Sequence, residues 1–271
     1  MTGSLVPAVS DHLELTILGC GSSSGSPAIG CHCPTCASDN PKNTRSRCSA
    51  YVRLGEQALV IDTGPDLRQQ ALREGLSRID AVLYTHPHAD HLNGIDDLRA
   101  FCYVKKGPIT LYGNAFTLDN IRSRFHYALM PPSPVWDKPV LVPEEVAQRF
   151  DFHGVAVTPI PLQHGKWPCL GWRIGNVAWL TDLSHIPDDS LALLEGLDVL
   201  FLDCLRHDPY PSHLGVQQSF AWAQRIAARR TILIHMTHQL EYQALTAECP
   251  PGIEVGYDGL TIRVPLPAGA A

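Results

Sequence analysis

Short apolar runs separated by polar and glycine-rich turns dominate the chain and predict a protein built mainly of β-strands. The runs are four to six residues long and rich in Leu, Ile and Val, which is typical of strands buried in a sheet. We expect strands at 13–18, 51–54, 58–61, 81–84, 109–112, 155–160, 170–174, 177–180, 199–202 and 231–234.

Fewer segments have the pattern of helices. We expect helices at 66–74, 191–194 and 216–228, whereas the Pro-rich segment 130–143 is expected to be irregular. No internal repeat or linker interrupts the chain, so residues 1–271 are expected to form a single domain. Many strands with helices between some of them favour an α/β fold in which two mixed sheets pack together with helices outside, an αββα sandwich.

The composition narrows the class of protein. The 271 residues are 45% hydrophobic and 18% charged, as in ordinary globular proteins. A formal net charge of −6 argues against binding to a nucleic acid polymer, because such proteins usually present a basic domain. The first eleven residues contain no Lys or Arg and no apolar run typical of a signal peptide, and no stretch has the length of a membrane span. We therefore expect a cytoplasmic protein without a membrane partner.

A dense group of potential metal ligands follows the apolar run 81–84. Residues 85–91 read T-H-P-H-A-D-H, which places four such side chains within six residues: His86, His88, Asp90 and His91. Imidazole suits transition metals such as Zn, Mn and Fe, and a carboxylate adds negative charge. A polar loop in which Asp90 only caps a helix is the alternative, but three His at this spacing after a buried strand favour a metal site.

This segment resembles the H-x-H-x-D-H signature of the metallo-β-lactamase superfamily. In that family the first two His and a distant His hold one metal ion. The Asp, the last His and another distant His hold a second ion, and a remote Asp bridges both. The resemblance therefore implies that later strand ends supply two His and one Asp.

Candidates for these ligands lie directly after later apolar runs, where a strand end can hold a side chain rigidly: His164, Asp182 and His235. Each alone would be an ordinary polar residue, but together, in the order that the resemblance implies, they complete a dinuclear metal centre. Asp62, in I-D-T-G, resembles a structural Asp of the family and is expected to orient a metal-binding His.

A second metal signal lies in a Cys-rich loop at about 19–48. Its C-x-C-x-x-C motif comprises Cys31, Cys33 and Cys36, and a structural zinc site requires four Cys or His ligands. His238, three residues beyond His235, is the preferred fourth ligand, while His32 and Cys48 are weaker options. Reduced free thiols are the alternative.

The Cys loop, the His cluster and the H-x-x-H near the C-terminus together resemble the phosphoribosyl cyclic phosphate phosphodiesterases of bacterial phosphonate catabolism, the PhnP family. The resemblance spans residues 15–262. It implies two Mn ions at the catalytic centre, where the ligands would also accept Zn or Fe, and one structural Zn. A sister group, similar to pyrroloquinoline quinone biosynthesis protein B, also has a Cys-rich loop, but its His cluster is degenerate and the one in this chain is intact.

The resemblance also assigns catalytic roles. His213 falls where the family has its catalytic His, so we expect it to protonate or stabilise the leaving oxygen. Without the resemblance it would be a polar residue at the start of a helix. Asp90 is expected to serve catalysis as well as metal binding. Arg99 and Trp167 are further candidates for substrate contact, with a solvated Arg and a core Trp as the alternatives.

The leading hypothesis is hydrolysis of a small cyclic phosphodiester, either 5-phosphoribosyl 1,2-cyclic phosphate or a 2′,3′-cyclic nucleotide, by a hydroxide that bridges two metal ions. Related enzymes use the same ligands on lactones, thioesters or β-lactams, and others process transfer RNA with a long basic arm that the sequence does not show. A non-catalytic metal-binding accessory protein is the remaining alternative. Related folds often form homodimers, and the sequence leaves that assembly open.

Overall fold

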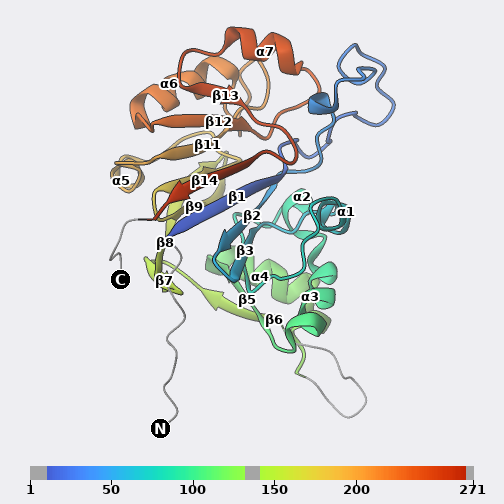
Figure 1. Cartoon of the computed structure of the whole chain (residues 1–271), viewed down its shortest axis with the longest axis vertical. Coiled ribbons are helices and arrows are strands. Elements are labelled where there is room, and N and C mark those ends of the chain that lie inside the picture. Colours follow the sequence, from blue (N-terminus) through green and yellow to red (C-terminus); the bar gives the residue numbers. More distant parts are fainter. Residues whose placement is uncertain (1–10, 132–140, 267–271) are drawn as a thin grey trace.

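Two seven-stranded sheets form the centre of the computed structural model, which describes residues 11–131 and 141–266 (Figure 1). In spatial order the first sheet comprises β14 (Thr261–Pro265), β1 (His12–Gly19), β2 (Ser49–Leu54), β3 (Gln57–Ile61), β4 (Ala81–Leu83), β5 (Ile109–Gly113) and β6 (Leu141–Glu145). The second comprises β13 (Ile253–Val255), β12 (Arg230–Ile234), β11 (Val199–Asp203), β10 (Val177–Leu180), β9 (Trp167–Ile174), β8 (Val155–His164) and β7 (Phe150–Phe152).

Both sheets are mixed, and helices connect their parallel strands. Strands β3 to β6 are parallel to one another, as are β10 to β13, whereas the remaining neighbours are antiparallel. A parallel pair needs a crossover connection, which is usually helical. The helices are α1 (Leu67–Arg73), α2 (Ala89–Leu92), α3 (Leu98–Lys105), α4 (Ala115–Arg124), α5 (Asp188–Ala192), α6 (Val216–Ile226) and α7 (Tyr242–Glu248), with short 3-10 turns at Pro41–Asn43, Ile95–Asp97 and His126–Leu129.

The main core lies between the two sheets. Strand β3 shows how alternation builds it: Leu59 and Ile61 pack into the core shared with the second sheet, while Val60 faces the other way, toward the helices of the first sheet. From the second sheet, the fully buried rings of Trp172 and Trp179 fill the same core. This inward and outward alternation fixes the register of each strand.

Helices cover the outer faces (Figure 1). Helices α1 to α4 lie beside the first sheet, and α6 and α7 lie beside the second. A separate apolar cluster joins the first sheet to its helices through Val82, Leu67 and Leu98. The αββα arrangement expected from the sequence is confirmed.

The sequence prediction omitted strands β6, β7, β13 and β14 and helices α2, α3, α4 and α7, and it misplaced one helix. The helix predicted at 191–194 is wrong in position, because α5 begins at Asp188, where acidic side chains suit a helix start, and Leu194 lies in the following turn. Part of the segment predicted as irregular, 130–143, forms the start of β6, while 132–140 lie outside the described residues. Pro143 fits in β6 because an edge strand needs no hydrogen bond on its outer side.

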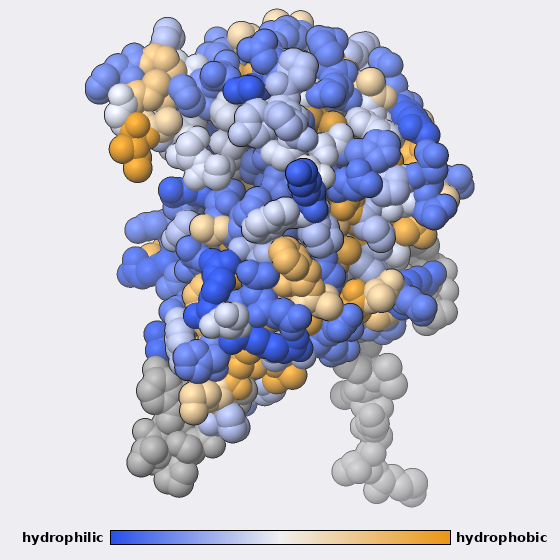
Figure 2. All heavy atoms as spheres, turned by 180° about the vertical axis from the view of Figure 1, so that it is seen from behind, coloured by the Kyte–Doolittle hydropathy of each residue, from blue (hydrophilic) through white to orange (hydrophobic). Residues whose placement is uncertain are grey.

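Two surface features bear on function. The Cys-rich loop projects from the body beside the second sheet (blue in Figure 1). The face seen in Figure 2 is largely hydrophilic, with small separate groups of apolar residues. In the part of the chain that the structure describes, the helices are all too short or too polar to cross a membrane.

Candidate active site

Strand ends at one edge of the two sheets bring the predicted ligands together. His86 and His88 lie in the loop after β4, and Asp90 and His91 lie in α2. The other three come from the second sheet: His164 ends β8, Asp182 follows β10, and His235 follows β12. Residues separated by almost 150 positions therefore meet where the strands of both sheets end.

The first cluster contains three imidazoles. Nε2 of His86 lies 2.9 Å from Nδ1 of His88, and that Nδ1 lies 3.3 Å from Nε2 of His164. Oδ2 of Asp182 lies 3.7 Å from Nε2 of His86. All four ligand atoms lie within 4.8 Å of one another. Three imidazole nitrogens and a carboxylate oxygen that converge in this way suit a shared divalent metal ion.

The second cluster adjoins the first. Nε2 of His91 lies 3.2 Å from an oxygen of Asp90 and 3.2 Å from Oδ1 of Asp182. Nε2 of His235 also lies 3.2 Å from Oδ1 of Asp182. Asp182 therefore offers one carboxylate oxygen to each cluster, as a bridging ligand must.

Buried nitrogens without hydrogen-bond partners support the fit to metal ions. Among the described residues, Nε2 of His91 and Nε2 of His235 are buried and make no hydrogen bond. Carboxylate oxygens lie close to both atoms, but not along hydrogen-bond directions. Buried polar atoms are normally paired, so side chains that point at a common centre fit divalent ions better than they fit one another.

The pKa shifts at the site also support a fit to positively charged ions. Burial alone would raise the pKa of Asp182, but His235, His91 and His86 hold it well below its usual value. Burial alone would lower the pKa of His235, but Asp182 and Asp203 raise it to about 10. The buried carboxylates thus demand positive charge, which protons supply when metal ions do not.

The ring nitrogens of His91 and His164 that face away from the clusters also have hydrogen-bond partners. Oδ2 of Asp62 lies 2.7 Å from Nδ1 of His91, and Asp62 accepts hydrogen bonds from the backbone N–H and the hydroxyl of Thr85. Nδ1 of His164 lies 2.8 Å from the carbonyl oxygen of Ser212. Such contacts fix the ring that presents its other nitrogen to a metal ion. The orienting role expected of Asp62 matches this geometry.

Three of the six non-glycine residues that have a positive φ in the described part of the chain lie at the same place. Asp62, Asp182 and His235 have φ values of 61°, 54° and 61°. Left-handed conformations are unfavourable for residues other than Gly and cluster at functional sites. At each of these positions the chain has just left a strand; the turns direct Asp182 and His235 into the shared centre and Asp62 toward Nδ1 of His91.

His213 lies at the edge of the clusters. Its ring stacks on that of His235 with centroids 4.8 Å apart, and its Nε2 lies 3.9 Å from Oδ2 of Asp182. The side chain is 11% exposed, so Nε2 borders both the centre and the solvent. This position suits a group that exchanges a proton with a substrate.

Asp203 is a site residue that the sequence reasoning missed. It is fully buried at the end of β11, with Oδ1 3.3 Å from Nδ1 of His235 and Oδ2 3.4 Å from Nδ1 of His213. It also accepts a hydrogen bond from the backbone N–H of Leu214. The available signal was an acidic residue ending an apolar strand, the same pattern that identified Asp182.

The three motif cysteines meet His238, as expected for the preferred fourth ligand. Sγ of Cys31 and Sγ of Cys33 lie 3.5 and 3.3 Å from Nδ1 of His238, and Cys36 lies in the same cluster. A hydrogen bond to His238 lowers the pKa of Cys33 to about 6, which favours the thiolate that binds metal. His32 and Cys48 lie outside this cluster; Cys48 is buried and accepts a hydrogen bond from Thr181.

The two further candidates for substrate contact differ in position. Arg99 is exposed on α3. Trp167 pairs with His164 across the β8–β9 hairpin, and its ring lies 4.6 Å from that of His88. Trp167 therefore borders the first cluster, and 42% of it is exposed.

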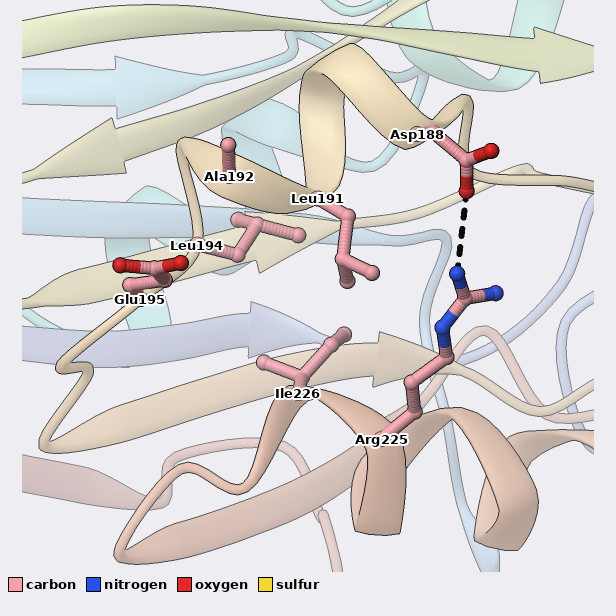
Figure 3. A pocket seen from close by; sticks show the side chains of 7 residues that line it. All are labelled: Asp188, Leu191, Ala192, Leu194, Glu195, Arg225 and Ile226. Carbon is pink, nitrogen blue, oxygen red and sulfur yellow. Dashed lines mark hydrogen bonds and ion pairs between the residues drawn. The ribbon is translucent and has the colours of Figure 1, made fainter.

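A separate hollow between α5 and α6 is unsuited to this chemistry (Figure 3). Its volume is about 400 Å³, and its lining residues are Asp188, Leu191, Ala192, Leu194, Glu195, Arg225 and Ile226. It contains no His or Cys, and Arg225 forms an ion pair with Asp188 across its mouth (Figure 3).

Known proteins are similar to this chain in fold and in sequence. The model of the β-lactamase superfamily domain matches residues 57–236. The crystal structure of a diphosphatase from the PhnP family has a TM-score of 0.88 and 37% identity, covering 94% of this chain and 98% of that one.

Two curated relatives extend the comparison. An octanoyltransferase of Porphyromonas gingivalis is 36% identical over 253 residues, which are 92% of this chain but 51% of the relative, so this chain spans about half of that protein. A ribonuclease Z of Mycobacterium bovis is 26% identical over 289 residues, covering 91% of this chain and 96% of the relative. Because the domain model matches more than half of the chain and the diphosphatase matches nearly all of it, the chain belongs to the metallo-β-lactamase superfamily and, within it, to the PhnP family.

Proposed function

We propose that this protein is a phosphodiesterase that hydrolyses a small cyclic phosphodiester. The fold is that of a family of metal-dependent hydrolases, and the His and Asp clusters suit divalent metal ions. The number of metal ions, two, and the phosphodiester substrate are the parts that we propose beyond this family assignment. One observation carries it: Asp182 offers one oxygen to each of two adjacent clusters, which is the arrangement that holds a pair of ions.

Seven side chains would hold the two ions. His86, His88 and His164 form one set, Asp90, His91 and His235 form the other, and Asp182 belongs to both. When bound, two adjacent divalent ions supply Lewis acidity toward a phosphoryl oxygen and activate a water molecule as the nucleophile. The oxygen and nitrogen ligands suit Mn, whereas the thiolates with His238 suit a structural Zn.

The protein's own contribution to bond cleavage centres on His213. Its Nε2 borders the clusters and can deliver a proton to the leaving oxygen. Asp203, next to Nδ1, stabilises the protonated ring and fixes its orientation. Asp203 also borders Nδ1 of His235, so one carboxylate positions both a proton donor and a metal ligand.

Turnover of bis(p-nitrophenyl) phosphate with added Mn tests the proposal, followed by 5-phosphoribosyl 1,2-cyclic phosphate and nucleoside 2′,3′-cyclic phosphates. We expect His88→Ala to lower turnover at least about 100-fold, because one of three imidazoles of a metal site is lost. His126→Ala, an exposed His outside the clusters, is the matched control and should retain activity.

The alternatives give different outcomes. Full activity of the His88→Ala variant would exclude the dinuclear phosphodiesterase. Turnover of a lactone, a thioester or a transfer RNA precursor without turnover of any small phosphodiester would assign the site to another branch of the superfamily. Absence of all turnover with both ions bound would favour the non-catalytic accessory protein.

A further inference from the structure

A buried chain of hydrogen bonds lies behind the two clusters and reaches one imidazole of each. Its centre is Asp62, which is fully buried and directly follows β3. Oδ2 of Asp62 lies 2.7 Å from Nδ1 of His91, and Nε2 of the same ring belongs to the second cluster. Oδ2 of Asp62 also accepts a hydrogen bond of 2.8 Å from the hydroxyl of Thr85. One carboxylate oxygen therefore has an imidazole on one side and a hydroxyl on the other.

The hydroxyl of Thr85 continues this chain to the first cluster. Oγ1 of Thr85 lies 3.0 Å from Nδ1 of His86. Nε2 of the same ring faces the first cluster, 2.9 Å from Nδ1 of His88 and 3.7 Å from Oδ2 of Asp182. Thr85 and His86 are both fully buried, so bulk solvent does not compete for these contacts.

The number of protons on Thr85 fixes the direction of the chain. A threonine hydroxyl carries one proton, and Thr85 donates it to Asp62. The oxygen of Thr85 must then accept from His86, so Nδ1 of His86 carries the proton of that contact. A neutral imidazole with its proton on Nδ1 presents a lone pair at Nε2, which is the form that binds a metal ion. The chain therefore selects the tautomer of His86 that suits the first cluster.

The backbone of Thr85 is held independently of its hydroxyl. Its N–H donates to Oδ1 of Asp62 at 2.8 Å, and its carbonyl oxygen accepts from the N–H of Leu170 at 2.9 Å. Sγ of Cys169 is a further neighbour of Nδ1 of His86, but at 3.9 Å a thiol is a weak partner. Removal of the hydroxyl should therefore affect His86 while the loop keeps its backbone contacts.

We infer that Thr85 is a positioning residue that extends the orienting action of Asp62 from His91 to His86. One buried carboxylate thereby aligns one ligand of each metal ion, directly in the second cluster and through a hydroxyl in the first. The inference rests on the proposed function, because it concerns the two ions that this function requires. It predicts that loss of the hydroxyl weakens one ion, whereas a change at Asp62 weakens both.

Thr85→Val tests the inference, because it retains the shape of the side chain and removes the hydroxyl. Calorimetric titration of Mn into the metal-free protein gives the number of ions and the Kd of each. We expect one Kd to rise about 10- to 100-fold, the usual effect of losing a partner behind a metal ligand, and the other to change less than about twofold. Thr85→Ser keeps the hydroxyl and should restore the first Kd. Asp62→Asn should raise both Kd values, because an amide cannot accept a hydrogen bond at both of its side-chain atoms.

Paired variants identify the ion that is affected. In a His235→Ala protein the ion of the first cluster remains, and adding Thr85→Val should raise its Kd. In a His88→Ala protein the ion of the second cluster remains, and adding Thr85→Val should change its Kd less than about twofold. Thr117→Val is the matched control: this Thr is also fully buried, but its hydroxyl has no hydrogen-bond partner among the described residues, so both Kd values should stay unchanged.

The outcomes separate this inference from the proposed function. Binding of a single ion by the unmodified protein would refute the dinuclear centre itself. If two ions bind and both Thr85→Val and the smaller Thr85→Ala weaken them equally, or change neither Kd beyond about twofold, the role of Thr85 is excluded and the proposed function stands. Failure of both variants to fold would also exclude it, because the hydroxyl would then serve the fold rather than one ion. Absence of phosphodiester turnover with both ions bound would instead refute the proposed function and leave the role of Thr85 in place.

Discussion

Asp203 offers the sharpest test of how this site is built, because a single buried carboxylate lies beside both the candidate proton donor and a candidate metal ligand. Asp203→Asn preserves the volume of the side chain and one acceptor oxygen. It replaces the other oxygen with an NH₂ group that cannot accept a hydrogen bond. In the native site both oxygens face imidazole Nδ1 atoms, at 3.3 Å from His235 and 3.4 Å from His213.

The expected magnitude follows from these contacts. The retained oxygen can still accept from the N–H of Leu214, or turn toward one imidazole, but it cannot serve all three groups. Both Nδ1 atoms lie at ion-pair distance from Asp203 without forming a hydrogen bond, so the interaction lost is electrostatic. We expect kcat/KM to fall about 10- to 150-fold, which corresponds to about 1.4–3 kcal/mol. Burial is complete at Asp203, so solvent does not weaken the effect.

The assay is steady-state turnover of bis(p-nitrophenyl) phosphate with saturating Mn, together with metal content and thermal unfolding. Asp198→Asn is the matched control: Asp198 directly precedes the same strand, at its opposite end, and pairs with Arg229. We expect this control to retain kcat/KM. A value for Asp203→Asn within twofold of the unmodified protein, with both ions bound, would refute the positioning role.

Two further predictions concern metal binding. A Cys31→Ala/Cys33→Ala variant should lose one Zn per chain by elemental analysis, because two of the four ligand atoms of the Cys cluster are removed. The ions of the His clusters should be retained. An unchanged Zn content would contradict the zinc site. Gly64→Ala should lower kcat/KM about 100-fold and weaken metal binding, because its Cβ would lie 2.1 Å from the carbonyl oxygen of Asp90 and displace the segment that contains Asp90. Gly107→Ala, whose Cβ meets no atom within 4 Å, is the control. Equal activity of the two variants would contradict this account.

The sequence predicted the ten inner strands of the two sheets because their apolar runs are buried and short, but it missed the four edge strands β6, β7, β13 and β14. Side chains of the two clusters that directly follow such runs, such as His235, could be located for the same reason. Helices were harder to predict where few residues are buried. In α4 the buried residues are Thr117, Leu118 and Ile121, a pattern too sparse to distinguish from a loop.

The roles of residues that depend on tertiary contacts could not be predicted from the sequence. Asp203 belongs to no motif, and its importance arises only because two imidazoles approach it from other loops. The His238 assignment was one of three options until the fold brought it to the thiols.

The position of β1 has a consequence for biosynthesis. This first strand pairs on one side with β2 and on the other with β14, near the end of the chain. His91 likewise needs His235 to complete its cluster. At about 5–20 residues per second, a ribosome takes on the order of 10 s to extend the chain from one His to the other. The nascent protein therefore passes through an interval in which only four of the seven side chains of the two clusters have been synthesised, and the clusters can be completed only after synthesis of the C-terminal strands.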